Sequence, residues 1–152
     1  MSFITKLKTA FGSPKATKKD QIKDTTEAII NDVDNVPFAV SDSNVLYAGL
    51  NELGGYYFFQ TVIVGSFHIK TVKGAQLKVI GNGFELSLDS DMIELESDKS
   101  NVLNRSISKI DFQIEEADAA KMDRSSVKQL ILTCKNEKVT FSIYELSKDE
   151  EE

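Results

Sequence analysis

Apolar and polar residues alternate almost without interruption over residues 66–97, SFHIKTVKGAQLKVIGNGFELSLDSDMIELES. Such alternation is the period of a β-strand that buries one face and exposes the other. Asn82-Gly83 is the strongest short signal for a two-residue hairpin turn, and it predicts that Val79 pairs with Leu86. The stretch therefore predicts consecutive antiparallel strands.

Two further turns complete the predicted register. A three-residue loop, Val72-Lys73-Gly74 with a left-handed Gly74, pairs Phe67 with Val79, and a Ser90-Asp91 turn pairs Leu88 with Ile93. Because a slip of one residue would invert the whole set, agreement over four strands favours this register. The predicted apolar face consists of Phe67, Ile69, Leu77, Val79, Leu86, Leu88, Ile93 and Leu95.

The segments before this stretch have a different spacing. Residues 20–33, with Asp20 as N-cap, and residues 41–53, ended by Gly54-Gly55, place apolar residues as helices do. Residues 56–64, YYFFQTVIV, are apolar on both faces, which is typical of a strand covered on both sides. Gly65 then predicts a bulge or a bend.

The alternation returns near the C-terminus. Ile110, Phe112 and Ile114 predict an inward-facing set, and residues 115–125 a connection with one helical turn. An Asn136-Glu137 turn would close the last hairpin and pair Cys134 with Val139. The predicted fold is α+β: two N-terminal helices followed by an antiparallel β-meander of about seven strands, forming a small barrel or a two-layer sheet.

Charge divides the 152 residues into three regions. Residues 1–19 form a basic N-terminal arm, residues 20–146 a single domain (helices in 20–53, meander in 56–146), and residues 147–152 an acidic tail. The net charge is −6, but residues 1–23 carry +5 and the remainder −11. An acidic body repels phosphates, so nucleic acid is not an expected partner.

Composition narrows the function classes further. A single cysteine excludes an internal disulfide and a multi-cysteine metal site, and it favours a reducing cytoplasm. No apolar run approaches the ~20 residues that cross a bilayer. Lys6 and Lys8 interrupt the apolar start that a signal peptide needs. We therefore expect a soluble, cytoplasmic protein.

The only histidine, His68, lies in the predicted register on a polar row with Lys78, Ser87 and Glu94. Serine, histidine and an acid in one row would have the composition of a catalytic triad. Adjacent strands are ~4.8 Å apart, so His68 and Ser87, two strands apart, would be separated by ~10 Å. The prediction is a solvated histidine and not a catalytic one.

Acids gather on the same predicted face, where Glu85 would lie opposite Glu96, near Asp89 and Glu94. Opposed like charges destabilise a hairpin unless water screens them or a cation binds. Carboxylates of this kind suit calcium or magnesium, but the ligand spacing of an EF-hand is missing. We expect a charged surface that discourages aggregation, and no metal or cofactor. Cys134 is predicted to be a buried thiol and not a nucleophile.

The order of strands over residues 56–146, with ISKIDF before a loop and a final hairpin, resembles that of bacterial pleckstrin-homology-like modules and related small β-barrels. The resemblance is one of topology. It implies a fold and no functional residues.

The basic arm contains an apolar stripe at helical spacing, with lysines off the stripe. An interfacial helix on an anionic membrane has this pattern. The alternatives are an arm docked on the protein's own sheet and a disordered segment. The residues expected to contact a membrane or a partner are Phe3, Ile4, Lys6, Leu7, Lys8 and Phe11.

The function expected from these patterns is a non-enzymatic binding or scaffold module. The basic arm would attach it to an anionic membrane surface or to an acidic protein partner. The alternative is a small-molecule-binding β-barrel, or a minor hydrolase with its site at one end of the sheet. We expect a protein partner, and both peripheral membrane contact and a homo-oligomer remain open.

Deleting residues 1–19 tests the arm. We expect a nearly unchanged melting temperature and the loss of co-sedimentation with anionic liposomes at low salt. Each lysine contributes ~1 kcal/mol near an anionic leaflet, and salt screens this attraction. Neutral liposomes are the control. A deletion that unfolds the protein would make the arm structural, and an intact chain that ignores anionic liposomes would contradict attachment.

Overall fold

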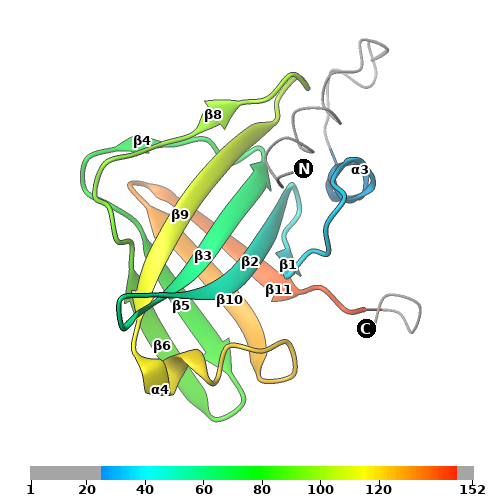
Figure 1. Cartoon of the computed structure of the whole chain (residues 1–152). Helices are drawn as coiled ribbons and strands as arrows, with labels where there is room; N and C mark the ends of the chain where they lie inside the picture. Colours follow the sequence, from blue (N-terminus) through cyan, green and yellow to red (C-terminus); the bar gives the residue numbers. More distant parts are fainter. Residues whose placement is uncertain (1–24, 147–152) are drawn as a thin grey trace.

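The computed structural model describes residues 25–146, and most of its regular structure is antiparallel β-sheet (Figure 1). Two short helices and eleven strands lie within those residues. In chain order the elements are α3 (Thr26–Asp32), β1 (Ala39–Val40), β2 (Asn44–Leu53), β3 (Tyr56–Gly65), β4 (Lys70–Thr71), β5 (Gln76–Gly81), β6 (Phe84–Asp89), β7 (Leu95–Glu96), β8 (Asp98–Lys99), β9 (Ser106–Ile114), α4 (Glu116–Ala119), β10 (Val127–Cys134) and β11 (Glu137–Ile143).

Nine of the strands form one curled sheet with the shape of a half-barrel. Their order is β6-β5-β10-β11-β1-β2-β3-β9-β8, and β4 and β7 form a separate two-stranded ladder. An isolated antiparallel bridge between Ser90, which follows β6, and Phe112 of β9 links the two sides of the curled sheet. The β-rich class of the prediction is confirmed, whereas the count of about seven strands is wrong.

Residues 41–53 were expected to be helical and instead contribute the strand β2. It pairs with β3 over ten residues, from Asn44 opposite Gly65 to Leu53 opposite Tyr56. Gly54 and Gly55 both have positive φ and form the two-residue turn of this hairpin. The ten-residue pairing with the apolar strand β3 outweighs the helical spacing of the leucines in β2. The same residues also fit a half-buried pleated surface, so they can form a strand.

One N-terminal helix remains within the described residues. Its N-cap is Thr25, whose hydroxyl accepts a hydrogen bond from the Ala28 N–H (3.1 Å). Asp20, the expected cap, lies outside the described residues. The prediction of two N-terminal helices is therefore wrong.

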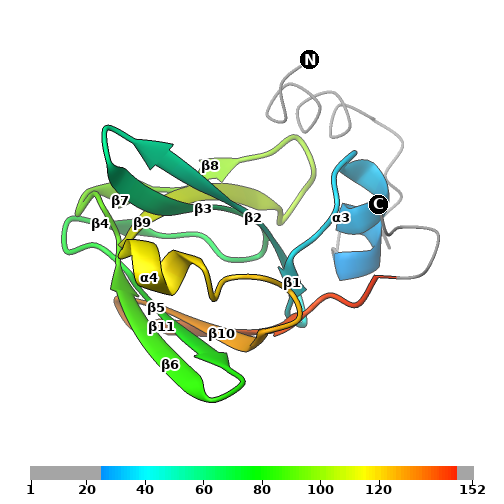
Figure 2. The same ribbon diagram turned by 60° about the horizontal axis from the view of Figure 1, so that its bottom comes forward.

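Helix α3 covers the outer face of the sheet beside β1 and β2 (Figure 2). Ile29 and Val33 of α3 pack there in a cluster with Val45, Tyr47, Val64 and Ile107. The opposite face of the same strands turns inward, where Leu46, Phe59 and Ile63 are buried. This end of β3 is thus covered on both sides, as its apolar sequence predicts.

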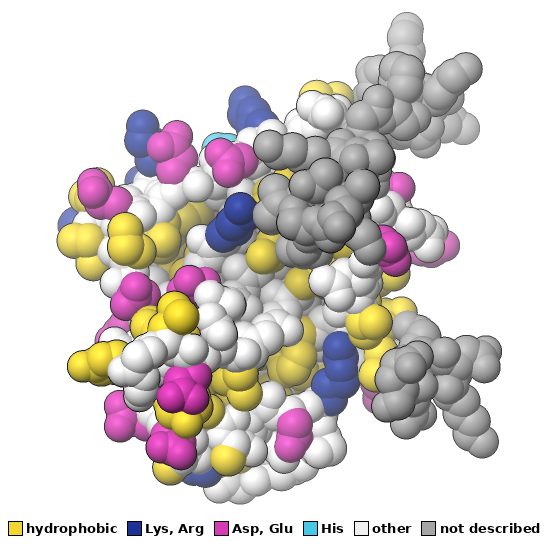
Figure 3. Space-filling view, viewed as in Figure 1, with side chains coloured by type: hydrophobic (Ala, Val, Ile, Leu, Met, Phe, Trp, Pro, Cys, Tyr) yellow, Lys and Arg dark blue, Asp and Glu magenta, His cyan; other side chains and the backbone are white. Residues whose placement is uncertain are grey.

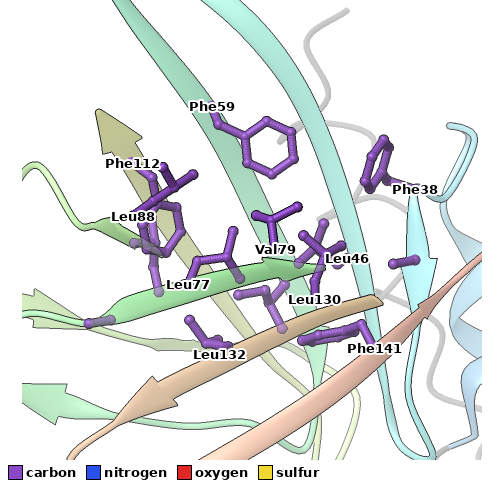
Figure 4. Close-up of a cluster of buried hydrophobic side chains, with 14 of the residues drawn as sticks. Phe38, Leu46, Phe59, Leu77, Val79, Leu88, Phe112, Leu130, Leu132 and Phe141 are labelled. Atoms are coloured by element: carbon purple, nitrogen blue, oxygen red, sulfur yellow. The ribbon is translucent and has the colours of Figure 1, made fainter. Parts of the chain in front are cut away.

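The concave side of the sheet is filled with side chains (Figure 4). Aromatic and aliphatic groups from β2, β3, β5, β9, β10 and β11 meet there, and Phe38 packs edge-on against Phe59 with ring centroids 5.7 Å apart. The expected inward set Ile110, Phe112 and Ile114 is buried in it. The expected helical turn is α4, which contributes Ala119.

Cys134 also lies in this core, so the prediction of a buried thiol is confirmed. Burial raises the pKa of the Cys134 thiol, and the nearby Glu137 raises it further.

Part of the predicted register is correct. The Asn82-Gly83 turn forms, with Val79 opposite Leu86. The second neighbour of β5 is β10, however, with Val79 opposite Leu130, so Phe67 does not pair with Val79. Turn rules identify partners that are close in sequence, and they cannot find a strand that lies about fifty residues further on.

The Ser90-Asp91 turn was also wrongly placed. The Asp91 N–H donates to the Asp111 carbonyl (2.8 Å) instead of closing a hairpin. Leu95 pairs with Thr71 in the β4–β7 ladder, and Ile93 is exposed. The seven other residues of the predicted apolar face are buried or packed against the core, so the faces were assigned better than the pairings.

The last hairpin turns one residue earlier than predicted. Its turn is Lys135-Asn136, with Lys135 at a φ of 55°, and Cys134 faces Glu137 while Leu132 faces Val139. The predicted pairing of Cys134 with Val139 is therefore wrong by two residues. An even shift keeps each side chain on its face, which is why the inward set survives.

Gly65 bends the chain at the end of β3, as its sequence position predicts. Its φ is 151°, and a Cβ built on it would lie 2.7 Å from the Asn44 Cα and would also overlap the Ser43 carbonyl oxygen. These are backbone atoms and cannot swing away. Only glycine allows the two segments to approach so closely.

Gly65→Ala should therefore destabilise the fold by about 1–3 kcal/mol, because the added methyl must displace backbone. Gly49→Ala is the matched control in the adjacent strand, since a Cβ there meets nothing within 4 Å. Urea denaturation of both variants measures the difference. Equal stability of the two would contradict the close approach at Gly65.

Candidate functional site

A polar pocket opens at one end of the half-barrel, where the β1–β2 turn, the end of β3 and the segment from β8 to β9 meet. Its volume is about 580 Å³. The residues that line it are Ser43, Ser66, His68, Lys99, Ser100, Val102, Leu103, Asn104, Arg105 and Ser106. We call this the His68 pocket.

The bend at Gly65 forms one wall of the pocket. It brings Ser66 against Ser43, whose hydroxyl oxygens lie 2.6 Å apart. The buried Asn44 holds the bend, because its Oδ1 accepts a hydrogen bond from the Phe67 N–H (2.8 Å). These contacts fix two hydroxyls at the rim of the pocket.

His68 faces this wall from the segment that follows β3. Its Nδ1 lies 2.8 Å from the Ser106 Oγ on β9, and which atom donates depends on the tautomer. Below this contact, the Oγ atoms of Ser97 and Ser108 lie 2.6 Å apart. The Ser97 hydroxyl also accepts from the Ile69 N–H (2.9 Å). Hydrogen bonds therefore satisfy the hydroxyls of Ser97, Ser106 and Ser108, which are buried.

An ion pair holds the loop of residues 100–105, which lines the pocket. The Arg105 side chain is only 1% exposed, and its Nη1 lies 2.9 Å from the Asp32 Oδ2 of α3. The Ser100 N–H donates to the Arg105 carbonyl (3.0 Å), which keeps the loop narrow. The pocket is thereby attached to the helix on the outer face of the sheet.

Tyr47 lies in the same outer layer and is buried there. Burial raises the pKa of the Tyr47 hydroxyl well above its usual range, although the positive charge of Arg105 acts in the opposite direction. The phenol therefore stays neutral beside the Arg105–Asp32 pair.

The structure separates the polar row that the sequence predicted. Lys78 does lie opposite Ser87, between β5 and β6. His68 is not opposite Lys78, whose other neighbour is Ile131 of β10. The predicted pairing of His68 with Lys78 is wrong for the same reason as the rest of that hairpin: β10 takes the place beside β5.

The predicted acid cluster does not form either. Glu85 lies opposite Ile80 and forms an ion pair with Lys78 (3.1 Å), while Glu96 lies opposite Lys70 in the other ladder. Acidic side chains are scattered over the face seen in Figure 3 and are not gathered at one place. Within residues 25–146, no group of three or more potential metal ligands comes together.

The residues expected to contact a membrane or a partner, from Phe3 to Phe11, lie outside the described residues, so that prediction stays a prediction. Among the described helices, none has the length and hydropathy to cross a bilayer.

From the sequence, His68 was predicted to be a solvated histidine, and the hydroxyls around it were not predicted. A signal was present, because Ser106 and Ser108 continue the two-residue period of Ile110, Phe112 and Ile114. Inward-facing serines need hydrogen-bond partners, so their positions indicate where the interior of the half-barrel becomes polar.

The pocket offers hydrogen-bond donors without competing acids. Lys99, the imidazole and several hydroxyls line it, and none of its described lining residues is Asp or Glu. Arg105 adds little net charge, because Asp32 neutralises it. In a chain with a net charge of −6, such a place favours an anionic group.

The His68–Ser106 contact has two elements of a hydrolytic site. Ser106 is only 6% exposed, however, and the described lining includes no carboxylate to orient the imidazole. The arrangement therefore suits binding better than nucleophilic attack.

Comparisons with protein-family models, with curated proteins and with solved structures found no match to this chain. Function must therefore be argued from the pocket itself.

Asp32→Asn tests the anchor behind the pocket. It removes a carboxylate that pairs with the buried guanidinium, and we expect a loss of about 2 kcal/mol, below the range for fully buried pairs because Asp32 is partly exposed. Asp118→Asn is the control, since its pair with Lys121 lies on the surface and should change stability by less than about 1 kcal/mol. Equal effects in urea denaturation would show that Arg105 does not depend on Asp32.

Proposed function

We propose that the protein is a non-enzymatic binding module that holds an anionic group of its ligand or partner in the His68 pocket. The observation that carries this proposal is the set of donors in the pocket: Lys99, the imidazole and the hydroxyls of Ser43 and Ser66, with no carboxylate among the described lining residues. The Ser43 and Ser66 hydroxyls are already held in place by hydrogen bonds, so they lose little entropy when an anion binds.

The filled interior supports a surface site over a ligand cavity. Small β-barrels that carry a ligand inside need an empty lumen. Here Phe59, Phe112 and Phe141 occupy the concave side of the sheet together with the aliphatic side chains around them. The alternative of a small-molecule-binding barrel is therefore less favoured than recognition at the polar end.

Phosphate is the simplest probe of the proposed site. In an NMR titration with inorganic phosphate, amide signals of residues 66–68 and 99–106 should shift together. Lys99→Gln should weaken binding roughly fivefold, since an exposed charge contact contributes about 1 kcal/mol. Lys128→Gln removes a lysine that lines a different part of the surface and should leave the affinity unchanged. No shift in these segments, or equal effects of the two variants, would contradict the proposal.

The hydrolase alternative has one favourable observation, the 2.8 Å contact between His68 and Ser106. A fluorophosphonate reagent distinguishes it from binding, because an activated serine would be labelled at Ser106 and His68→Ala would abolish the labelling. The binding proposal expects no labelling.

A further inference from the structure

Among the described residues, strand β2 has no neighbour other than β3 over the half that extends beyond β1. The two strands pair only through Ala39–Leu46 and Val40–Val45. Within residues 25–146, no strand pairs with residues 47–53 on that side. In Figure 1 this half of β2 continues past β1 to the turn with β3.

The hairpin register identifies the backbone groups on this edge. The two-residue turn makes Leu53–Tyr56 a hydrogen-bonded pair, and every second pair along β2 repeats it. Ala48, Leu50 and Glu52 therefore direct their N–H and C=O groups away from β3. The Leu46 carbonyl also points away from β3, and it accepts a hydrogen bond from the Phe38 N–H (2.8 Å).

The edge is also apolar and open. Leu50, Leu53 and Tyr56 are 46%, 59% and 62% exposed, and a Cβ on Gly49 would meet nothing within 4 Å. Natural sheets commonly protect such an edge with charged side chains. The β6 edge carries Glu85 and Asp89, whereas β2 has only Glu52 over residues 47–53.

We propose that a second copy of this chain pairs with β2, antiparallel and about a twofold axis at Leu50. Leu50 would face Leu50, and Ala48 would face Glu52 on each side of the axis. This register uses the outward groups of all three residues in both copies. It also keeps the two Glu52 carboxylates apart, because each lies opposite an alanine.

The contact is self-complementary, which is the condition for a closed dimer. It would extend the sheet from one subunit into the other and cover part of the exposed apolar surface. The His68 pocket lies at the other end of the β2–β3 hairpin, beside Ser43 and Ser66. Dimerisation and anion binding can therefore succeed or fail separately.

Proline substitution tests the edge in the full-length chain. Leu50→Pro removes an outward N–H without removing a hydrogen bond to β3, so the fold is expected to survive. Ser87→Pro is the matched control, because the Ser87 N–H points away from β5 at the β6 edge. The Ser90 N–H donates to the Ala75 carbonyl of the neighbouring segment (2.9 Å), so alternate residues of β6, including Ser87, direct their N–H groups outward. Sedimentation velocity should show a dimer for the unmodified chain and for Ser87→Pro. Leu50→Pro should be a monomer with an unchanged circular dichroism spectrum.

Cysteine cross-linking tests the register. Hydrogen-bonded partners in an antiparallel pair have Cα atoms about 5.5 Å apart, within the reach of a disulfide. Leu50→Cys should thus form a disulfide-linked dimer under mild oxidation. Leu53→Cys, at a similarly exposed position, should not, because the two copies of residue 53 would lie about 20 Å apart along the strands. The native Cys134 is buried and is common to both variants.

The proposal is overturned if the unmodified chain is a monomer at all concentrations, or if the two proline variants have the same mass. It is also overturned if Leu53→Cys cross-links as readily as Leu50→Cys. A phosphate titration of the Leu50→Pro variant separates this result from the proposed function, since the His68 pocket should still bind phosphate in a monomer.

Discussion

The ten-residue ladder between β2 and β3 is the interaction on which the rest of the structure depends. Its inward side chains, such as Leu46 and Phe59, contribute to the main core, and its outward side chains, such as Val45 and Val64, carry helix α3. One end of the ladder is bent at Gly65 and forms the wall of the His68 pocket. The other end extends beyond β1 and leaves an edge that no strand within residues 25–146 pairs with. A single hairpin thus places both surfaces that we propose for recognition.

Arg105 connects the His68 pocket to the helix on the outer face of the sheet. Its loop closes the His68 pocket, while its guanidinium reaches Asp32 on the outer helix. A buried cation needs its partner, so α3 and the loop must keep their relative position if the ion pair is to survive.

Local chemistry made part of this fold predictable. The Asn82-Gly83 turn, the inward positions of Ile110 and Phe112, and the burial of Cys134 follow from a period of two and from the conformational freedom of particular turn residues. Residues 41–53 were assigned wrongly because their leucines fit either spacing, and only pairing with β3 decides between helix and strand. The pocket was missed since its serines come from segments that meet only after folding. The inward parity of Ser106 and Ser108 was the one local indication of it.

The pairing of β5 with β10 imposes an order on how the molecule can be completed. Val79 meets Leu130 across this ladder, so the whole chain between them must be synthesised before the contact can form. Contacts of such large sequence separation close slowly, because a long loop must first be restricted. On the ribosome, the β5–β6 hairpin therefore waits with one apolar face uncovered until the last hairpin leaves the exit tunnel. Delayed burial of this apolar face during synthesis is the consequence of pairing two segments that lie about fifty residues apart in the sequence.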